Sequence, residues 1–160
     1  MFAVTLICVG KLKEKFYLAA SEEYAKRLRG YVDFTLIELP ETRLPDDPSP
    51  AQIAQGLAKE AELIRARIPK GAWFCVLTPE GTQLSSEELA AALASVKGSG
   101  RSAACFLIGS SFGMDPSLKQ LADRKLFMSK MTFPHHLARV MVLEQLYRAE
   151  SIQAGTKYHK

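Results

Sequence analysis

Several features that mark other protein classes are missing from this sequence. No run approaches the roughly 18 consecutive apolar residues of a membrane-spanning helix, which excludes a helical membrane protein. The N-terminal segment MFAVTLICVGK has no basic residues before its apolar run and no small-residue cleavage pattern after it. We therefore interpret it as a first β-strand rather than a signal peptide, and we expect a cytoplasmic protein with no membrane partner.

Cysteine is scarce and has neither metal-binding nor redox spacing. Cys8, Cys75 and Cys105 each lie in an apolar run typical of a buried strand, and the sequence has no CxxC pair. An odd number of cysteines without an export signal favours reduced core thiols over disulfides. The adjacent His135 and His136 would point about 100° apart on a helix, and no suitable third ligand lies nearby. No metal site is therefore predicted.

The chain also lacks an internal repeat and any linker that would divide it. Its 160 residues fit a single domain, 1–160, which can bury roughly 70% of its unfolded surface. The net charge is +4, yet residues 119–160 carry eight Lys and Arg against three acids, so this third contributes +5 and the rest −1. A basic third fits either a polyanionic partner such as nucleic acid or a solvated helix face.

What the sequence does contain is a regular alternation of strand and helix patterns. Continuous apolar, β-branched runs predict strands, and helical spacing of apolar residues predicts helices. The predicted strands are 3–9, 33–39, 73–77, 103–108 and 125–128, with a turn at 78–81. The predicted helices are 14–29, 50–67, 85–96, 116–122 and 134–153, and the third begins with a capping-box pattern at Ser85 and Glu88. This alternation gives an α/β fold, a mostly parallel sheet with helices on both faces.

The loops that follow the strands carry no established phosphate motif. FLIGSSFG, residues 106–113, matches neither the P-loop GxxxxGK[ST] nor the dinucleotide fingerprint GxGxxG, which excludes a P-loop nucleotide triphosphatase. Its small residues let backbone N–H groups approach a ligand, although a plain tight turn explains them equally well. Ligands of such folds bind at the carboxyl ends of strands. The loops after Leu77, Ile108 and Met128 are therefore the candidate site.

The helix predicted at 134–153 is apolar around almost its whole circumference. Leu137 and Met141 lie among the polar residues, opposite the main apolar arc. A single sheet face does not require this much apolar surface, so we expect the helix to pack against a second molecule as well. Arg139 falls in the middle of the apolar arc. It must either pair with an acid or reach an anionic ligand near the start of the helix.

Two long segments and the terminal KYHK resemble one protein family closely. The segments are FLIGSSFG and LFMSKMTFPHHLARVMVLEQLYRAESI, and the family is that of the 23S rRNA pseudouridine N3-methyltransferases of the SPOUT class, the RlmH family. The resemblance extends to Val9-Gly10-Lys11, to 24–29 and to FTLIELP, and so covers essentially the full length. It implies an α/β fold with a C-terminal trefoil knot. It also implies a homodimer that uses S-adenosylmethionine to methylate N3 of a pseudouridine in a hairpin of 23S rRNA within the assembled ribosome.

The same resemblance implies the site residues. The methyl donor is expected in the knot, held mainly by backbone groups at Leu77, Gly109, Leu126, Phe127, Met128, Ser129, Lys130 and Met131. Many members have a second glycine where this chain has Ser110. Tyr158 or His159 is expected to orient the base or to accept the N3 proton, and Arg139 to bind phosphate or stabilise charge, with His135 as a further candidate. The competing classes are a non-enzymatic ribosome-associated RNA-binding module and a SPOUT methyltransferase acting on tRNA.

Overall fold

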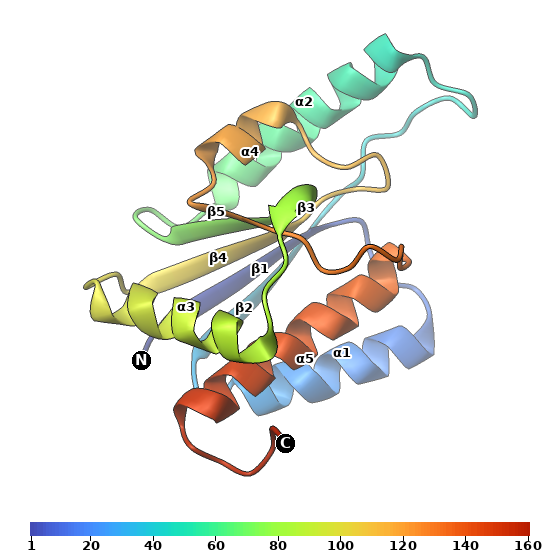
Figure 1. Cartoon of the computed structure of the whole chain (residues 1–160). Helices are drawn as coiled ribbons and strands as arrows, with labels where there is room; N and C mark the ends of the chain where they lie inside the picture. The colour runs from blue at the N-terminus through green and yellow to red at the C-terminus, as the bar shows by residue number, and fades with distance from the viewer.

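A five-stranded parallel sheet with the strand order β2-β1-β4-β3-β5 runs through the centre of the molecule (Figure 1). The computed structural model describes all of residues 1–160. The strands are β1 (Ala3–Val9), β2 (Asp33–Leu39), β3 (Trp73–Thr82), β4 (Ala103–Ile108) and β5 (Arg124–Leu126). Every neighbouring pair is parallel, so the carboxyl ends of all the strands meet along one edge. The predicted α/β sheet is confirmed.

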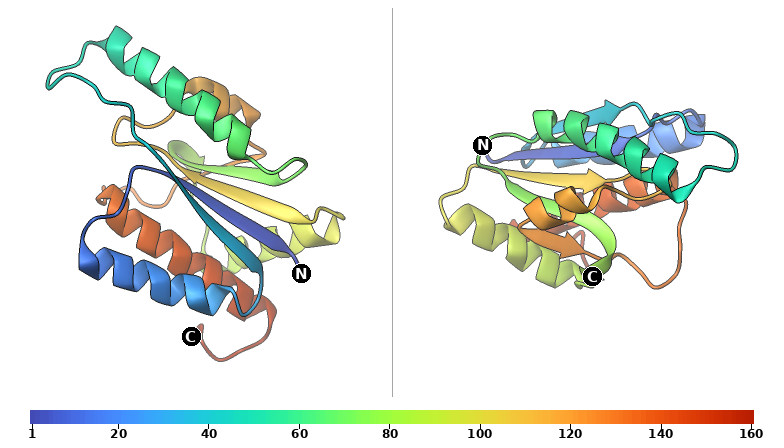
Figure 2. Two further views of the ribbon diagram at one scale, coloured as in Figure 1. Left: turned by 180° about the vertical axis from the view of Figure 1, so that it is seen from behind. Right: turned by 90° about the horizontal axis from the view of Figure 1, so that it is seen from above.

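Helices cover both faces of this sheet, as the alternating pattern predicted (Figure 2). They are α1 (Lys15–Leu28), α2 (Pro50–Arg67), α3 (Ser86–Gly98), α4 (Pro116–Leu121) and α5 (His135–Gln153). α1, α3 and α5 lie on one face and α2 and α4 on the other, and each side encloses its own apolar core. The predicted capping box starts α3, where the Ser85 hydroxyl accepts the Glu88 N–H at 3.1 Å and the Ser85 N–H donates to the Glu88 carboxylate at 2.7 Å.

Strand β3 is longer than the sequence predicted. Residues 78–81 were expected to form a turn because Pro79 and Gly81 are turn-forming residues. In the structure, β3 continues to Thr82, and a shift in its register with β5 between Leu77 and Thr82 absorbs the extra residues. The Thr82 carbonyl accepts the Phe127 N–H at 3.1 Å. A partner strand that arrives much later in the sequence thus overrides the local turn preference.

The C-terminal part of the chain forms a trefoil knot. β5 lies at the sheet edge beyond β3, whereas α5 lies between α1 and α3 near the middle of the molecule. To reach that position, residues 127–134 pass behind the connection from β3 to α3 in the view of Figure 1. The crossing is tight, because a Cβ added to Gly81 would lie 2.6 Å from the backbone carbonyl carbon of Leu126. Chains rarely thread loops in this way. The family resemblance predicted the knot, and the fold agrees.

The three cysteines are buried and unpaired, as expected. Burial raises the pKa of the thiols of Cys8, Cys75 and Cys105 to about 12, so all three stay protonated near neutral pH. They behave as small apolar side chains of the core. None of the helices combines the length and the apolar character that crossing a membrane requires.

Candidate functional site

The last part of β3 and the loops that leave β4 and β5 enclose a cavity of about 480 Å³ at the carboxyl edge of the sheet. Seven of the eight positions expected to bind the donor line this cavity: Leu77, Gly109, Leu126, Phe127, Met128, Ser129 and Met131. The remaining one, Lys130, lies in the same loop with its side chain exposed and outside the lining. Topology and family resemblance thus converge on one place in the fold, which we call the donor cavity.

The loop after β4, residues 109–113, is a rigid wall of the donor cavity. The Ser110 N–H donates to the Gly113 carbonyl at 2.9 Å, and the Gly113 N–H donates back to Ser110 at 2.8 Å. Gly113 has a φ of +93°, which only glycine adopts without strain. A Cβ on Gly109 would lie 2.4 Å from the Gly113 carbonyl oxygen. Ser110 is buried without a positive φ, so the fold accommodates the serine that stands in place of a second glycine.

The loop between β5 and α5 offers unused backbone donors to the donor cavity. Residues 128–130 belong to no helix or strand, and their N–H groups donate to no group of this chain. The next N–H, of Met131, donates to the Ser129 hydroxyl at 3.0 Å. Backbone N–H groups normally find a partner, and here those of Met128 and Ser129 belong to residues that line an open cavity. They are available to hold a ligand that carries hydrogen-bond acceptors.

One acid in the cavity lining was not picked out from the sequence. Glu80 accepts hydrogen bonds from the Thr78 hydroxyl and, at 2.9 Å, from the ammonium of Lys119. These two bonds hold the pKa of its carboxyl at about 2, so it is ionised at neutral pH. Glu80 was not identified from the sequence because residues 78–81 were predicted to form a turn. Its place after a buried strand was the signal that could have identified it.

Arg139 lies outside the donor cavity and is buried, with 2% of its surface exposed. Its guanidinium donates to the Glu38 carboxylate and to the Gly10 carbonyl, the latter at 3.0 Å. Burial alone would raise the pKa of Glu38. Hydrogen bonds from Arg139 and from the Leu12 N–H outweigh burial and hold that pKa below its usual value. Of the two alternatives left open by the sequence, the structure shows pairing with an acid.

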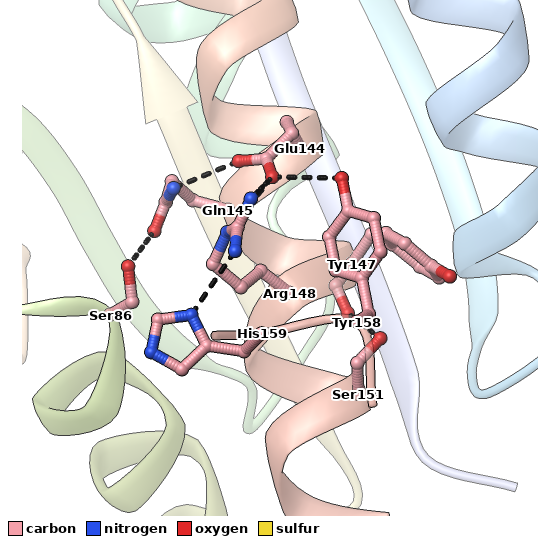
Figure 3. A network of polar contacts seen from close by, with 8 residues as sticks. All are labelled: Ser86, Glu144, Gln145, Tyr147, Arg148, Ser151, Tyr158 and His159. Atoms are coloured by element: carbon pink, nitrogen blue, oxygen red, sulfur yellow. Dashed lines mark hydrogen bonds and ion pairs between the residues drawn. The ribbon is translucent and has the colours of Figure 1, made fainter. Parts of the chain in front are cut away.

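The C-terminal tail packs against α5 instead of fraying (Figure 3). The Tyr158 hydroxyl donates to Glu144 at 3.0 Å, and the same carboxylate pairs with Arg148. Arg148 donates to Nδ1 of His159 at 3.1 Å, so His159 carries its proton on Nε2 and donates it to Glu87 at 2.7 Å. Neither tail residue lines the donor cavity. The expected catalytic tail and the expected donor site are therefore separate within one protomer.

The tail network predicts an unusual titration of Tyr158. Burial, followed by the hydrogen bond to Glu144, raises the pKa of this phenol to about 12. A phenol with a raised pKa keeps its proton as the pH increases, so Tyr158 should still be protonated at pH 11. In NMR spectra of protein labelled with ¹³C at tyrosine Cζ, the resonance that is absent in Tyr158→Phe belongs to Tyr158. We expect the chemical shift of this resonance to change with pH with a midpoint near pH 12. Glu144→Gln should lower that midpoint, and a parent midpoint near 10 would contradict the network.

A second cavity of about 560 Å³ lies on the other side of the loop after β5, between α3 and α5. Leu126, Phe127 and Met128 line both cavities. The apolar circumference of α5 is largely explained by its neighbours, because α1 and α3 flank it and no residue of 136–153 is fully exposed. Val140 and Met141 remain half-buried in the wall of this second, mainly apolar cavity.

The paired histidines do not form a metal site. His136 interacts through Nδ1 with the Glu14 carboxylate at 3.1 Å and makes an edge contact with the ring of Tyr17. His135 lies in the lining of the donor cavity. No three His, Cys, Asp or Glu side chains gather in an arrangement that would hold a metal ion.

Comparisons with known proteins agree with this architecture. Residues 2–159 match the family described as predicted SPOUT methyltransferases. The chain is 44% identical to ribosomal RNA large subunit methyltransferase H of Moorella thermoacetica over the full length of both chains. It is 43% identical to the protein of the same name from Ruminiclostridium cellulolyticum, covering 98% of this chain and 99% of the relative.

Solved structures support the fold at much lower sequence identity. A probable methyltransferase of Bordetella pertussis superimposes with a TM-score of 0.55 at 14% identity, covering 92% of this chain and 93% of that one. A probable methylase family protein of Haemophilus influenzae gives a TM-score of 0.54 at 13% identity, covering 99% of this chain and 70% of that one. The full-length match to the family and its relatives, together with the knotted fold, shows that this chain belongs to the SPOUT methyltransferase family.

Proposed function

We propose that this protein transfers a methyl group from S-adenosylmethionine to N3 of a pseudouridine in 23S rRNA of the assembled ribosome. The observation that carries the proposal is the donor cavity, which gathers seven of the eight expected donor positions from three separate segments of the chain. The chain is also 44% identical to a relative named ribosomal RNA large subunit methyltransferase H. That relative's name supports rRNA as the substrate, and the pseudouridine N3 position rests on the family resemblance.

The donor cavity suits S-adenosylmethionine, the methyl donor of SPOUT methyltransferases. The free N–H groups of residues 128–130 can bind acceptor atoms of the donor, and the absence of a side chain at Gly109 leaves the loop after β4 close to the cavity. When bound, the sulfonium supplies an activated methyl group. The protein's own task is to hold the reacting atoms in line and to exclude water.

The proton on N3 of the base must leave as the methyl group arrives. We assign this step to the tail: Tyr158, which keeps its own proton, orients the base, and His159 orients the base or accepts the proton. Neither lies at the donor cavity of its own protomer, so the site is completed by the tail of a second protomer or by movement of its own tail. The half-buried Val140 and Met141 beside the second cavity support a homodimer. Arg139 then acts by holding the Gly10 backbone, since its side chain is buried.

Methyl incorporation tests the proposal directly. Radiolabelled S-adenosylmethionine would be supplied with intact ribosomes, protein-free 23S rRNA or bulk tRNA, and the modified nucleoside identified by mass spectrometry. We expect N3-methylpseudouridine from ribosomes alone. Methylation of tRNA would favour a tRNA-modifying enzyme. Calorimetry that detects no binding of S-adenosylmethionine would favour the RNA-binding module.

His159→Ala tests the role assigned to the tail. We expect kcat on ribosomes to fall by about 10²-fold or more, the usual contribution of a positioned acid or base. The affinity for S-adenosylmethionine should not change, because His159 lies outside the donor cavity. Lys160→Ala is the matched control, since that terminal residue is exposed and makes no polar contact. Undiminished methylation by His159→Ala at saturating donor would exclude His159 from the chemistry.

A further inference from the structure

A polar groove of about 720 Å³ adjoins the donor cavity along the carboxyl edge of the sheet. It lies over the ends of β1 and β2, whereas the donor cavity lies over the ends of β3, β4 and β5. Ser111 and His135 line both. The two spaces are therefore neighbours along this edge. A chain-like substrate whose reacting unit sits at the donor cavity would place the neighbouring units in this groove.

Two lysines stand on the wall of the groove with no partner. Lys11 and Lys13 are exposed and form no ion pair or hydrogen bond within the chain. Leu12 between them is buried, with 3% of its surface exposed, so the chain turns the two lysines outward on either side of it. No role for these two lysines was predicted from the sequence, because the excess of basic charge lies in the C-terminal third.

The backbone that carries these lysines is held by two hydrogen bonds to side chains of other elements. The Leu12 N–H donates to Glu38 at 3.2 Å, and the Gly10 carbonyl accepts from Arg139 at 3.0 Å. Glu38 and Arg139 form an ion pair with each other, and Arg139 is buried. The ion pair of Arg139 and Glu38 thus holds the loop from both sides of Lys11. A loop held in this way presents its two ammonium groups with little loss of backbone freedom on binding.

The acids of the groove already have partners. Glu14 pairs with His136 at 3.1 Å, and Glu41 accepts a hydrogen bond from the Ser111 hydroxyl at 2.8 Å. The Ser111 hydroxyl is neutral, so Glu41 keeps its negative charge, and the two lysine ammonium groups are the groove charges that make no hydrogen bond or ion pair within the chain. An anionic ligand matches this arrangement, because each ammonium can contact one phosphate.

An aromatic pair continues the groove onto the start of α1. The rings of Phe16 and Tyr17 lie 4.4 Å apart, and Tyr17 lines the groove. Phe16 is 67% exposed, which is unusual for so large an apolar side chain. The starts of α1 and α5 lie side by side (Figure 1), and the ring of Tyr17 makes an edge contact with His136 at the start of α5, with 6.0 Å between the ring centroids. Lysines beside exposed aromatic rings are the combination that single-stranded nucleic acid recognises.

We propose that this groove binds the single-stranded RNA segment that flanks the reacting nucleotide. Lys11 and Lys13 contact successive phosphates, and a base next to the target stacks on Phe16 and Tyr17. The proposal rests on the proposed function for the identity of the reaction, and it deepens that function by assigning the surface that holds the RNA. It also gives the buried Arg139 a purpose, since Arg139 fixes the loop that bears both lysines.

The test compares Lys11→Ala/Lys13→Ala with Lys59→Ala/Lys70→Ala. The control pair removes the same charge from exposed, unpaired lysines on α2 and just before β3, neither of which lines the groove. For the groove variant we expect KM for ribosomes to rise about 10- to 100-fold, with kcat at saturating ribosomes within about 3-fold. In a plot of the logarithm of the RNA-binding constant against the logarithm of the salt concentration, the slope should become less negative by about 1.4. This corresponds to about 0.7 for each lost phosphate contact. Phe16→Ala should weaken RNA binding about 10-fold.

Three outcomes would overturn the assignment. The first is an unchanged KM and salt slope in the groove variant, and the second is an equal loss in the control pair. The third is weakened binding to intact ribosomes with unchanged binding to protein-free 23S rRNA, which would assign the groove to an acidic ribosomal protein. S-adenosylmethionine affinity, measured by calorimetry, should be equal in all variants. RNA binding is measured directly and does not depend on methylation. A parent protein that binds 23S rRNA but methylates nothing would therefore contradict the proposed function, and the binding test of the groove could still be carried out.

Discussion

Gly81→Ala is expected to destabilise the fold by at least about 3 kcal/mol, the upper range for inserting one methyl group into a packed position. The added Cβ would lie 2.6 Å from the carbonyl carbon and 2.7 Å from the nitrogen of Leu126. These are backbone atoms of β5, which cannot rotate away as a flexible side chain would. The substitution therefore has to move β3 and β5 apart at the place where the knot crosses.

Urea unfolding followed through Trp73, the single tryptophan, measures this effect. With an m-value of about 2 kcal/mol per molar, a loss of about 3 kcal/mol lowers the midpoint by about 1.5 M. Gly98→Ala is the matched control, since a Cβ there meets no atom within 4 Å. Gly98 is the last residue of α3, so the control should unfold at or slightly above the parent midpoint. A Gly81→Ala midpoint equal to that of the control would show that the crossing is looser than the structure indicates.

Local patterns in the sequence predict most of the elements because most of them satisfy local rules. The boundaries of β1, β2 and β4 and of α2 agree with the predicted ranges. In each case the apolar run or the helix cap is contained within the element itself. The extension of β3 could not be predicted in this way, because Pro79 and Gly81 are turn-forming residues and Thr82 gains its partner from Phe127, far along the chain.

The site was predictable to the extent that it depends on topology. Parallel strands end along one edge of the sheet, so the segments after Leu77 and Ile108 could be grouped from the sequence alone. The knot could not be derived from periodicity, and it came from the family resemblance alone. The partner of Arg139 could not be predicted either, because Glu38 lies 101 residues earlier in the sequence and only the fold brings the two side chains together.

The separation of the tail from the donor cavity has the same cause. Composition described TKYHK as a polar end, and the resemblance gave Tyr158 and His159 their expected role. Only the fold shows that Glu144 and Arg148 hold the two residues against α5 in the single protomer (Figure 3). Glu87 of α3 also accepts a hydrogen bond from His159. Either those contacts exchange during the reaction, or a second protomer supplies the tail. In both cases Tyr158 must exchange its bond to Glu144 before it can approach a substrate by this route.

Gly109→Ala is expected to weaken S-adenosylmethionine binding at least about 100-fold, which corresponds to about 2.7 kcal/mol. A Cβ at this position would lie 2.4 Å from the Gly113 carbonyl oxygen and 2.9 Å from its carbon. The same carbonyl accepts the N–H of Ser110, so the methyl group cannot be accommodated without breaking that turn. The loop that walls the donor cavity would then shift, and every donor contact that depends on its position would be lost together.

Calorimetric titration of S-adenosylmethionine, with Gly98→Ala as the control, measures this loss. The fold should survive better than in Gly81→Ala, because the loop at 109–113 borders an open cavity whereas Gly81 abuts backbone on the path of the knot. The two glycine substitutions thus test two separate properties. Gly81→Ala tests how closely β3 and β5 pack at the knot, and Gly109→Ala tests the shape of the donor cavity wall. If Gly109→Ala remains folded and binds the donor within about 3-fold of the parent, the loop after β4 does not shape the donor site and the proposed mode of binding fails.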